Sequence, residues 1–298
     1  MEIEYANKKP VWHKISRKQA KEMGWKIVKS RWIDINKGDE ENPNYRSRFV
    51  GKEFNDGEVE GLFAATPPLE ALRLILSWAA TGGIGLLDGT KTGETRKCIM
   101  LADVSRAFFE APAKRDLCVE LPAEALVGNE TAADTVGKLD ASLYGTRDAS
   151  ANWQEEVARC MLEWGFVVGK YNPCMYYHPE RAIRCLVHGD DYVSVGSRIG
   201  MDWLKEKLQM RFEIKVKVIG SRADLGEVKE ERVLNRIIRW TEDGWEYEAD
   251  QRHADLIVRE TGAPGMSTLT HPGGEKLALD REGETAELVG RKPPVSGQ

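Results

Sequence analysis

The sequence lacks the features that mark disulfide-stabilised, zinc-binding and membrane-spanning proteins. Its five cysteines form no Cys-x-x-Cys pair, and their odd number and scattered positions argue against a disulfide framework or a zinc module. No apolar run reaches the roughly 18 residues that cross a membrane, and the acidic N-terminal residues contain no apolar segment of a secretory signal. We therefore expect an intracellular protein, cytoplasmic or nuclear, with reduced cysteines and no membrane partner.

An excess of positive charge is also missing, although proteins that bind nucleic acid usually neutralise phosphates with Lys and Arg. The net charge of the 298 residues is −5. The charge is unevenly distributed, because residues 1–54 contain 13 Lys and Arg against 8 Asp and Glu. A basic first lobe is compatible with one face that binds a polyanion, but solvated surface charge is the commoner explanation.

Hydrophobic periodicity predicts an α+β fold, and the length suggests about two domains. Period-two alternation in residues 31–36 and 45–54, around a polar turn, predicts a β-hairpin. Apolar residues at helical spacing predict helices at residues 69–80, 149–164, 201–212 and 250–261. Short apolar runs predict strands at residues 98–104, 117–121, 175–177 and 185–195. The order of these elements around residues 98–212 predicts a split βαβ sheet with helices on one face. Residues 85–93 weakly resemble a phosphate loop, and we interpret them as an ordinary loop.

Two adjacent acids, Asp190 and Asp191, interrupt an apolar, β-branched run in the manner of a hairpin tip. Successive side chains of a strand point to opposite faces, so at most one of the pair faces a given site unless the turn re-aims them. A divalent-metal site would need a third carboxylate, which Asp103 at the end of another apolar segment offers. The alternative is an Asx-type turn in which Gly189 supplies a positive φ and the acids cap backbone groups.

Four motifs occur in an order that carries a family resemblance. They are Tyr45–Phe54, Asp103–Phe109, Ser142–Ala149 with Trp153 shortly after it, and His188–Asp191. In this order and spacing they resemble the reverse transcriptase of copia-type LTR retrotransposons, over about residues 25–261. The resemblance implies an RNA-directed DNA polymerase that extends a primer with dNTPs along an RNA or DNA template, with other retrotransposon polyprotein products as further partners.

The same resemblance implies a right-hand polymerase with fingers, palm and a partial thumb. We expect a fingers-like lobe in residues 1–95, a palm with the catalytic acids in 96–219, and a primer-grip or thumb-like region in 220–262. Residues 263–298 are rich in Gly, Pro and polar residues, and we expect an irregular tail.

Catalysis in this family implies two Mg²⁺ ions, with Mn²⁺ as a substitute, held by carboxylates. By resemblance, Asp103 and Asp190 are the main ligands. Asp191 assists or stabilises the site, and the carbonyl of Val104 completes one coordination shell. The three acids are therefore the expected catalytic residues.

Several residues are expected to contact the incoming nucleotide. Phe108 follows Asp103 by five residues, where related enzymes carry an aromatic side chain that blocks a ribose 2′-hydroxyl, although plain core packing is the alternative. Arg48 and Lys52 share one face of a strand and are suited to grip a triphosphate, with ordinary surface charge as the alternative.

A further set lies in the third motif. Tyr144 and Gly145 occupy the family's template- and nucleotide-facing turn, where Gly145 permits close backbone approach, and Arg147 is expected to touch nucleotide or template. We expect Trp153 and Trp164 to be core residues rather than platforms on which bases stack.

The sequence departs from the family pattern immediately before the paired acids. His188 and Gly189 stand where the family usually has Tyr and an apolar or small residue. Two alternatives to an active polymerase remain open. One is a catalytically inactive retroelement remnant that binds nucleic acid, and the other is a metal-dependent nuclease or phosphatase, for which the sequence offers no evident general base.

Overall fold

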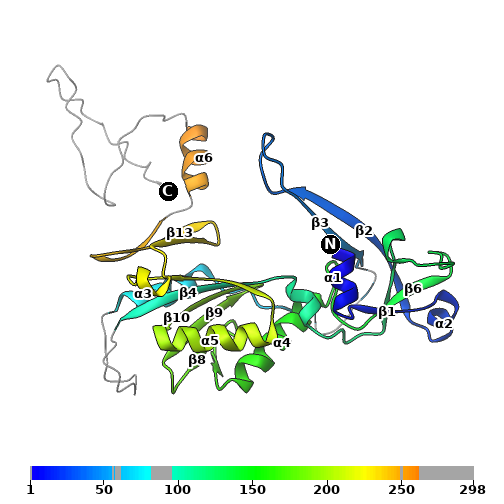
Figure 1. Ribbon diagram of the computed structural model, residues 1–298, viewed down its shortest axis with the longest axis horizontal. Helices are drawn as coiled ribbons and strands as arrows, with labels where there is room; N and C mark the ends of the chain where they lie inside the picture. The colour runs from blue at the N-terminus through cyan, green and yellow to red at the C-terminus, as the bar shows by residue number, and fades with distance from the viewer. Residues whose placement is uncertain (1, 56, 58–61, 82–95, 249–250, 262–298) are drawn as a thin grey trace, which may run out of the picture. The chain divides into compact units, whose positions relative to one another are not determined.

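The computed structural model describes residues 2–55, 57, 62–81, 96–248 and 251–261 (Figure 1). The chain divides into two units, residues 1–248 and 249–298. The second unit contains one described helix, α6 (Gln251–Thr261), which confirms the helix expected there. The expected loop at 85–93 and the expected tail at 263–298 lie outside the described residues.

The first sheet has five strands in the order β1-β6-β5-β2-β3. Its members are β1 (Trp12–Ser16), β2 (Lys26–Asn36), β3 (Tyr45–Lys52), β5 (Leu117–Glu120) and β6 (Thr135–Leu139). Strands β2 and β3 form the predicted hairpin, and two short helices, α1 (Glu2–Lys8) and α2 (Arg17–Glu22), accompany the sheet. Strands β5 and β6 belong to this sheet, although the sequence assigned their residues to the palm-like region.

The second sheet carries the acids and has six strands in the order β11-β4-β10-β9-β8-β7. Its members are β4 (Lys97–Val104), β7 (Val167–Val168), β8 (Met175–His178), β9 (Ile183–His188), β10 (Asp191–Ser197) and β11 (Ile214–Ile219). Every neighbouring pair is antiparallel. The order brings β4 and β10, which are far apart in sequence, side by side in the middle of the sheet.

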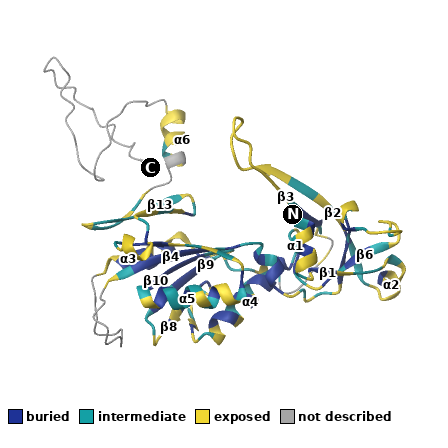
Figure 2. Cartoon of the chain, viewed as in Figure 1, coloured by how far each residue is buried: buried dark blue, intermediate teal, exposed yellow. Residues whose placement is uncertain are grey.

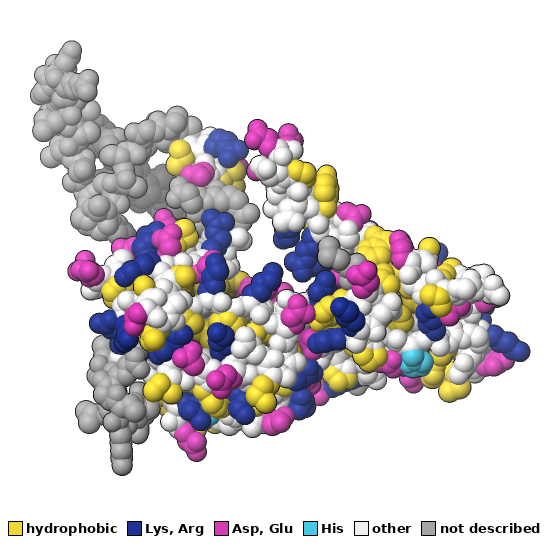
Figure 3. Space-filling view, in the orientation of Figure 1, with side chains coloured by type: hydrophobic (Ala, Val, Ile, Leu, Met, Phe, Trp, Pro, Cys, Tyr) yellow, Lys and Arg dark blue, Asp and Glu magenta, His cyan; other side chains and the backbone are white. Residues whose placement is uncertain are grey.

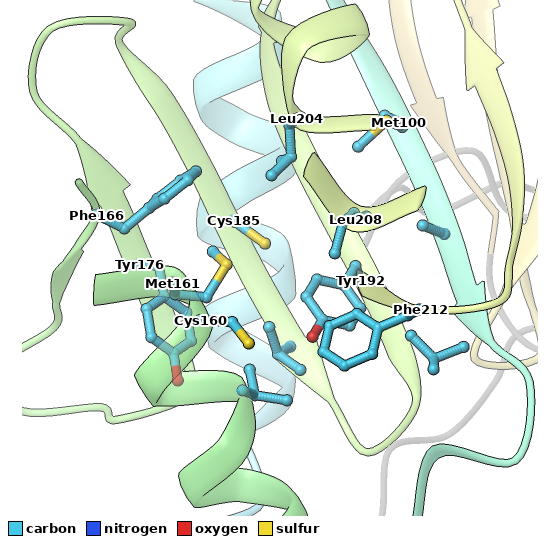
Figure 4. Packing of buried hydrophobic residues seen from close by; sticks show 14 of the residues in the cluster. Met100, Cys160, Met161, Phe166, Tyr176, Cys185, Tyr192, Leu204, Leu208 and Phe212 are labelled. Carbon is cyan, nitrogen blue, oxygen red and sulfur yellow. The ribbon is translucent and has the colours of Figure 1, made fainter. Parts of the chain in front are cut away.

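Both faces of this sheet are covered. Helices α4 (Ala149–Glu163) and α5 (Arg198–Arg211) pack on one face through a core that includes Met100, Tyr192 and Leu204 (Figure 4). Helix α3 (Leu69–Ala80) packs on the other face, together with a small sheet of β12 (Glu230–Val233), β13 (Arg236–Thr241) and β14 (Gly244–Tyr247). Figure 2 shows the buried residues concentrated in the sheet between these layers.

The two helices of the predicted unit, α4 and α5, lie on one face of the sheet as expected, whereas the cover of the opposite face by α3 and the small sheet was not predicted. Strand β4 is buried along most of its length, so its alternating side chains are apolar on both sides. Met100 and Ala102 join one core cluster, whereas Ile99 and Leu101 join the other. Two apolar faces both require cover, since exposure of either would leave a large hydrophobic surface in water.

An ion-pair network ties the end of β3 to the start of α4. The two terminal guanidinium nitrogens of Arg115 donate to the Glu53 carboxylate, at 2.8 and 2.7 Å, and one of them also donates to Asp148 at 2.6 Å. Burial raises the pKa of the Glu53 carboxyl, but the bonds from Arg115 and the Arg147 amide outweigh it and hold the pKa below its usual range. Because Glu53 is buried, removal of Arg115 would leave an uncompensated charge.

All five cysteines are buried, and none of them forms a disulfide among the described residues. None of the described helices is long and apolar enough to cross a membrane. On the face shown in Figure 3, Lys and Arg side chains are interspersed with acidic ones.

Stability should depend on the packing of α5 against the sheet. Leu204→Ala should lower the free energy of unfolding by about 2–5 kcal/mol, because the fully buried side chain would leave a cavity. Met210→Ala, on the same helix at an 82% exposed position, should change it by less than about 0.5 kcal/mol. Urea denaturation of both variants checks this, and similar losses in the two would contradict the described packing.

Candidate active site

The three acids meet at one end of the second sheet. Antiparallel pairing of β10 with β4 places Asp191 directly opposite Asp103. Pairing of β10 with β9 places Asp191 opposite His188, which leaves Gly189 and Asp190 as the two-residue turn. The register therefore brings Asp103 beside the hairpin tip, as the sequence predicted.

Backbone and side-chain hydrogen bonds hold the turn. Gly189 has a φ of +63°, the left-handed conformation that glycine adopts readily. The Val104 amide donates to the Asp190 carbonyl at 3.0 Å, and the Trp153 indole Nε1 donates to the Gly189 carbonyl at 2.7 Å. The positive φ of Gly189 agrees with the turn interpretation, but among the described residues neither the Asp190 nor the Asp191 carboxylate caps a backbone group. The position of both acids beside Asp103 agrees with the metal-site interpretation.

The acids border two separate depressions. Asp103, Val104 and Asp190 border a cleft of about 730 Å³, whose other walls include Arg46 and Lys215. Asp191, together with Asp103, borders a smaller pocket of about 160 Å³. Asp190 and Asp191 thus border different spaces, as the alternation of side chains at a strand start predicts.

The carboxylates repel one another. Burial, followed by the charges of Asp190 and Asp103, raises the pKa of Asp191 to about 6. Burial and the charge of Asp190 also raise the pKa of Asp103, while Lys215 and Arg46 act in the opposite direction. The site therefore concentrates negative charge that its two cationic neighbours offset only in part.

Metal binding is suggested by this charge and by the donor type. Among the described residues, no group of three or more His, Cys, Asp and Glu side chains is arranged to enclose an ion. Asp103 and Asp190 nevertheless present carboxylate oxygens, the ligands that Mg²⁺ prefers, to one cleft. Burial is the larger cause of the raised pKa of Asp103 and Asp191, and repulsion between the carboxylates adds to it. A divalent cation there would relieve that repulsion, so these residues fit such an ion.

Arg48, Tyr144 and Phe108 lie together beside the acids. The Arg48 guanidinium lies over the Tyr144 ring at 5.1 Å, and the Phe108 ring contacts the same tyrosine with centroids 4.7 Å apart. Burial raises the pKa of Tyr144 to about 12, and the charge of Asp190 also raises it. Within the described part of the chain Arg48 forms no ion pair, and its buried Nε has no hydrogen-bond partner.

Phe108 also borders a cavity of about 300 Å³ that reaches the acid turn. Trp153, His188 and Gly189 form part of the same wall. The side chain of Phe108 is half-buried and packs against the core on α4 and α5. Its position is therefore compatible with both interpretations of this residue, core packing and a gate beside the acids.

Lys52, Gly145 and Arg147 lie near the end of β3. The Lys52 ammonium lies 5.9 Å from the Phe54 ring centre, and the Arg147 guanidinium donates to the Gly57 carbonyl at 2.9 Å. Gly145 has a φ of +81°, and a Cβ there would come within 2.1 Å of the Gly51 carbonyl oxygen. The close approach that Gly145 permits is thus one between two segments of this chain.

Sequence reasoning missed the cationic side of the cleft. Lys215 lies opposite Asp103 in the pairing of β11 with β4, and its signal was the alternation of Lys with apolar residues in that strand. Arg46 lies two residues before Arg48, within a motif already singled out. Arg106 also borders the cleft, has a φ of +52° and pairs with Glu2 of α1 at 2.7 Å; no sequence signal identified it.

The two tryptophans are core residues, as expected. Trp153 is 3% exposed and packs edge-on against Phe212, with ring centroids 5.3 Å apart. Trp164 is partly buried against the same cluster. The additional hydrogen bond from Trp153 to the acid turn was not predicted.

Comparison with known proteins decides the family. A family model described as reverse transcriptase (RNA-dependent DNA polymerase) matches residues 12–228, which is most of the chain. This chain belongs to the reverse transcriptase family. Membership confirms the resemblance noted in the sequence, and the right-hand polymerase fold that it implied agrees with the observed α+β class.

A curated relative points to retrotransposons. A retrovirus-related Pol polyprotein from transposon TNT 1-94 of Nicotiana tabacum is 26% identical over 201 residues. The match covers 64% of this reverse transcriptase chain but only 14% of that polyprotein. The copia-type assignment made from the four motifs is confirmed at the level of the domain.

Two telomerase structures are also similar to the chain. Apo telomerase from Candida tropicalis, truncated from its C-terminal domain, matches with a TM-score of 0.40 and 10% identity over 82% of this chain and 59% of its own. Telomerase from Candida albicans, in complex with a fragment of telomeric RNA, matches with a TM-score of 0.43 and 8% identity over 84% of this chain and 49% of its own.

Removal of one charge from the acid cluster should stabilise the folded protein. In metal-free buffer at pH 7.5, we expect Asp191→Asn to raise the free energy of unfolding by about 1–2 kcal/mol. The pKa of Asp191 is about 6 in the folded protein and about 4 in an unfolded chain. This group therefore favours folding most below about pH 4, and that contribution is lost as the pH rises through about 6.

The difference between the variant and the wild type should accordingly vanish as the pH falls towards 4. Urea titrations at several pH values, with a chelator present, measure it. Asp243→Asn is the matched control, because it removes the same charge from an exposed turn. A gain from Asp191→Asn that is equal at pH 4 and pH 7.5 would contradict the described repulsion.

Proposed function

We propose that this chain is the polymerase part of a retrotransposon Pol polyprotein and extends a primer with dNTPs along an RNA or DNA template. The observation that carries the proposal is the register of β4 and β10, which brings Asp103 to the Asp190–Asp191 tip in a member of the reverse transcriptase family. Other products of the same polyprotein are its proposed partners.

Asp103 and Asp190 would hold two Mg²⁺ ions, or Mn²⁺, with Asp191 and the Val104 carbonyl alongside. Such ions, when bound, activate the primer 3′-hydroxyl and neutralise the charge on the leaving pyrophosphate. The hydrogen bond from the Val104 amide to Asp190 fixes the two segments relative to each other before any substrate arrives. Prior positioning of this kind is what phosphoryl transfer requires of a protein.

The basic side chains near the cleft would bind the triphosphate and the nucleic-acid backbone. Arg48 is the best candidate for the triphosphate, because its guanidinium stacks on Tyr144 beside Asp190 and forms no ion pair with any described residue. Lys52, on the same strand, and Arg147 and Gly145, in the adjoining turn, would complete the nucleotide-facing surface. Lys215 and Arg46 would attract polyanions towards the acids.

The regions of the chain would correspond to the subdomains of a right-hand polymerase. Residues 1–95 would act as fingers, 96–219 as the palm, 220–262 as a primer grip with part of a thumb, and 263–298 as a tail. Strands β5 and β6 lie within the residues assigned to the palm, but they pair with strands of the fingers and would belong to the fingers sheet.

Asp190→Asn should abolish synthesis without unfolding the protein. We expect the rate of single-nucleotide primer extension on an RNA template, with dNTPs and Mg²⁺, to fall by about 10²–10⁴-fold, because a metal-binding carboxylate is lost. Glu206→Gln, at an exposed position of α5, should extend at the wild-type rate.

Two results would contradict the proposal: no extension by folded wild-type protein, or equal extension by Asp190→Asn and wild type. Salt-dependent binding of primer–template without synthesis would instead identify an inactive remnant that still binds nucleic acid.

Phe108→Val should relax discrimination against ribonucleotides. If Phe108 blocks the ribose 2′-hydroxyl, the smaller side chain should raise the ratio of rNTP to dNTP incorporation by about 10–100-fold. Phe63→Val, at an 83% exposed position that does not line the cavity, is the control. Steady-state kinetics with each nucleotide provide the ratio, and an unchanged ratio would assign Phe108 to the core alone.

A further inference from the structure

Trp153 of α4 links the helical layer to the acid turn. The ring is 3% exposed, and its Nε1–H donates to the Gly189 carbonyl at 2.7 Å. Packing against Phe212 would bury an aromatic side chain of any kind here, since the ring centroids lie 5.3 Å apart. The packing therefore does not account for a donor, whereas the hydrogen bond uses the one polar atom that the indole has.

The two peptide groups that flank Asp190 are held from two different elements. The carbonyl before Asp190 belongs to Gly189 and accepts from Trp153. The carbonyl of Asp190 itself accepts from the Val104 amide on β4. With both carbonyls fixed, the backbone on each side of Asp190 has little freedom to rotate, and so the direction in which its carboxylate leaves the turn is set.

Gly189 favours the backbone conformation in which the first of these bonds forms. At a φ of +63° this residue adopts a conformation that costs glycine little. An added Cβ would meet nothing within 4 Å, so the backbone conformation rather than lack of space favours glycine here. The departure from the family pattern at this position is consistent with a turn whose carbonyl is directed towards the indole.

We propose that Trp153 is a positioning residue, which orients the Asp190 carboxylate for divalent-metal binding through the Gly189 carbonyl. The inference rests on the proposed function, because it assumes that Asp190 binds the catalytic ion. In this role Trp153 would act through the Gly189 carbonyl and would not itself be a ligand of the ion. Residues that orient metal ligands in this indirect way typically change metal affinity or activity by about 10–100-fold when they are replaced.

Direct binding of Mn²⁺ tests the inference without any need for synthesis. Electron paramagnetic resonance of free Mn²⁺ gives the affinity of the full chain, with Asp190→Asn as the reference that lacks the ligand. We expect Trp153→Phe to bind Mn²⁺ about 10–100-fold more weakly than wild type. In primer extension, the Mg²⁺ concentration for half-maximal rate should rise by a similar factor, while the KM for dNTP stays within about twofold.

Trp164→Phe is the matched control, because it makes the same substitution at the end of α4 against the same core. It should leave Mn²⁺ affinity unchanged. A second variant separates the donor from the ring: site-specific replacement of Trp153 by β-(3-benzothienyl)alanine keeps the bicyclic shape and removes the N–H. This protein should melt within a few degrees of wild type and still lose Mn²⁺ affinity.

The outcomes are distinct. If the benzothienyl protein binds Mn²⁺ as wild type does while Asp190→Asn binds it weakly, Trp153 is a core residue only and the inference is overturned. If Asp190→Asn also binds Mn²⁺ as wild type does, the proposed metal site fails and the positioning role falls with it.

Discussion

The antiparallel register between β4 and β10 is the constraint on which the site depends. It sets Asp103 opposite Asp191 and leaves Asp190 in the turn, so a shift by one residue would move an acid to the other face of the sheet. The register is itself enforced by apolar side chains on both faces, because each face packs against its own layer. The position of the acids at the edge thus relies on hydrophobic burial along most of the length of both strands.

That burial also supports an arrangement that is unfavourable by itself. Three carboxylates near one another in a partly buried place raise the pKa of Asp103 and Asp191. A site that concentrates like charges commonly lowers the free energy of unfolding, and burial in the surrounding core must offset that loss. Here the offsetting burial includes sheet residues such as Met100 and Tyr192, which pack against α4 and α5.

Positive charge is placed locally rather than overall. The chain is acidic, with a net charge of −5, yet Arg46 and Lys215 border the cleft that Asp103 and Asp190 share. The field at a cleft depends on nearby groups, because screening by salt reduces the effect of charges beyond about 8–10 Å. Net charge therefore says little about the charge around this cleft, which depends on the position of a few cationic side chains.

The sequence by itself determined the elements whose signals are local. Alternation predicted the β2–β3 hairpin, helical spacing predicted α3 at Leu69–Ala80, and the order of four motifs identified the family and its three acids. These signals depend on near neighbours, which fix backbone preference and the periodicity of the buried face.

Only the tertiary structure decided what depends on residues far apart in the chain. It placed β5 and β6 in the first sheet, put helices on both faces of the second, set Lys215 opposite Asp103 and brought Trp153 to the Gly189 carbonyl. No local preference encodes these pairings. Which strands pair, and which donor reaches which carbonyl, follows from how all the apolar faces are buried at once.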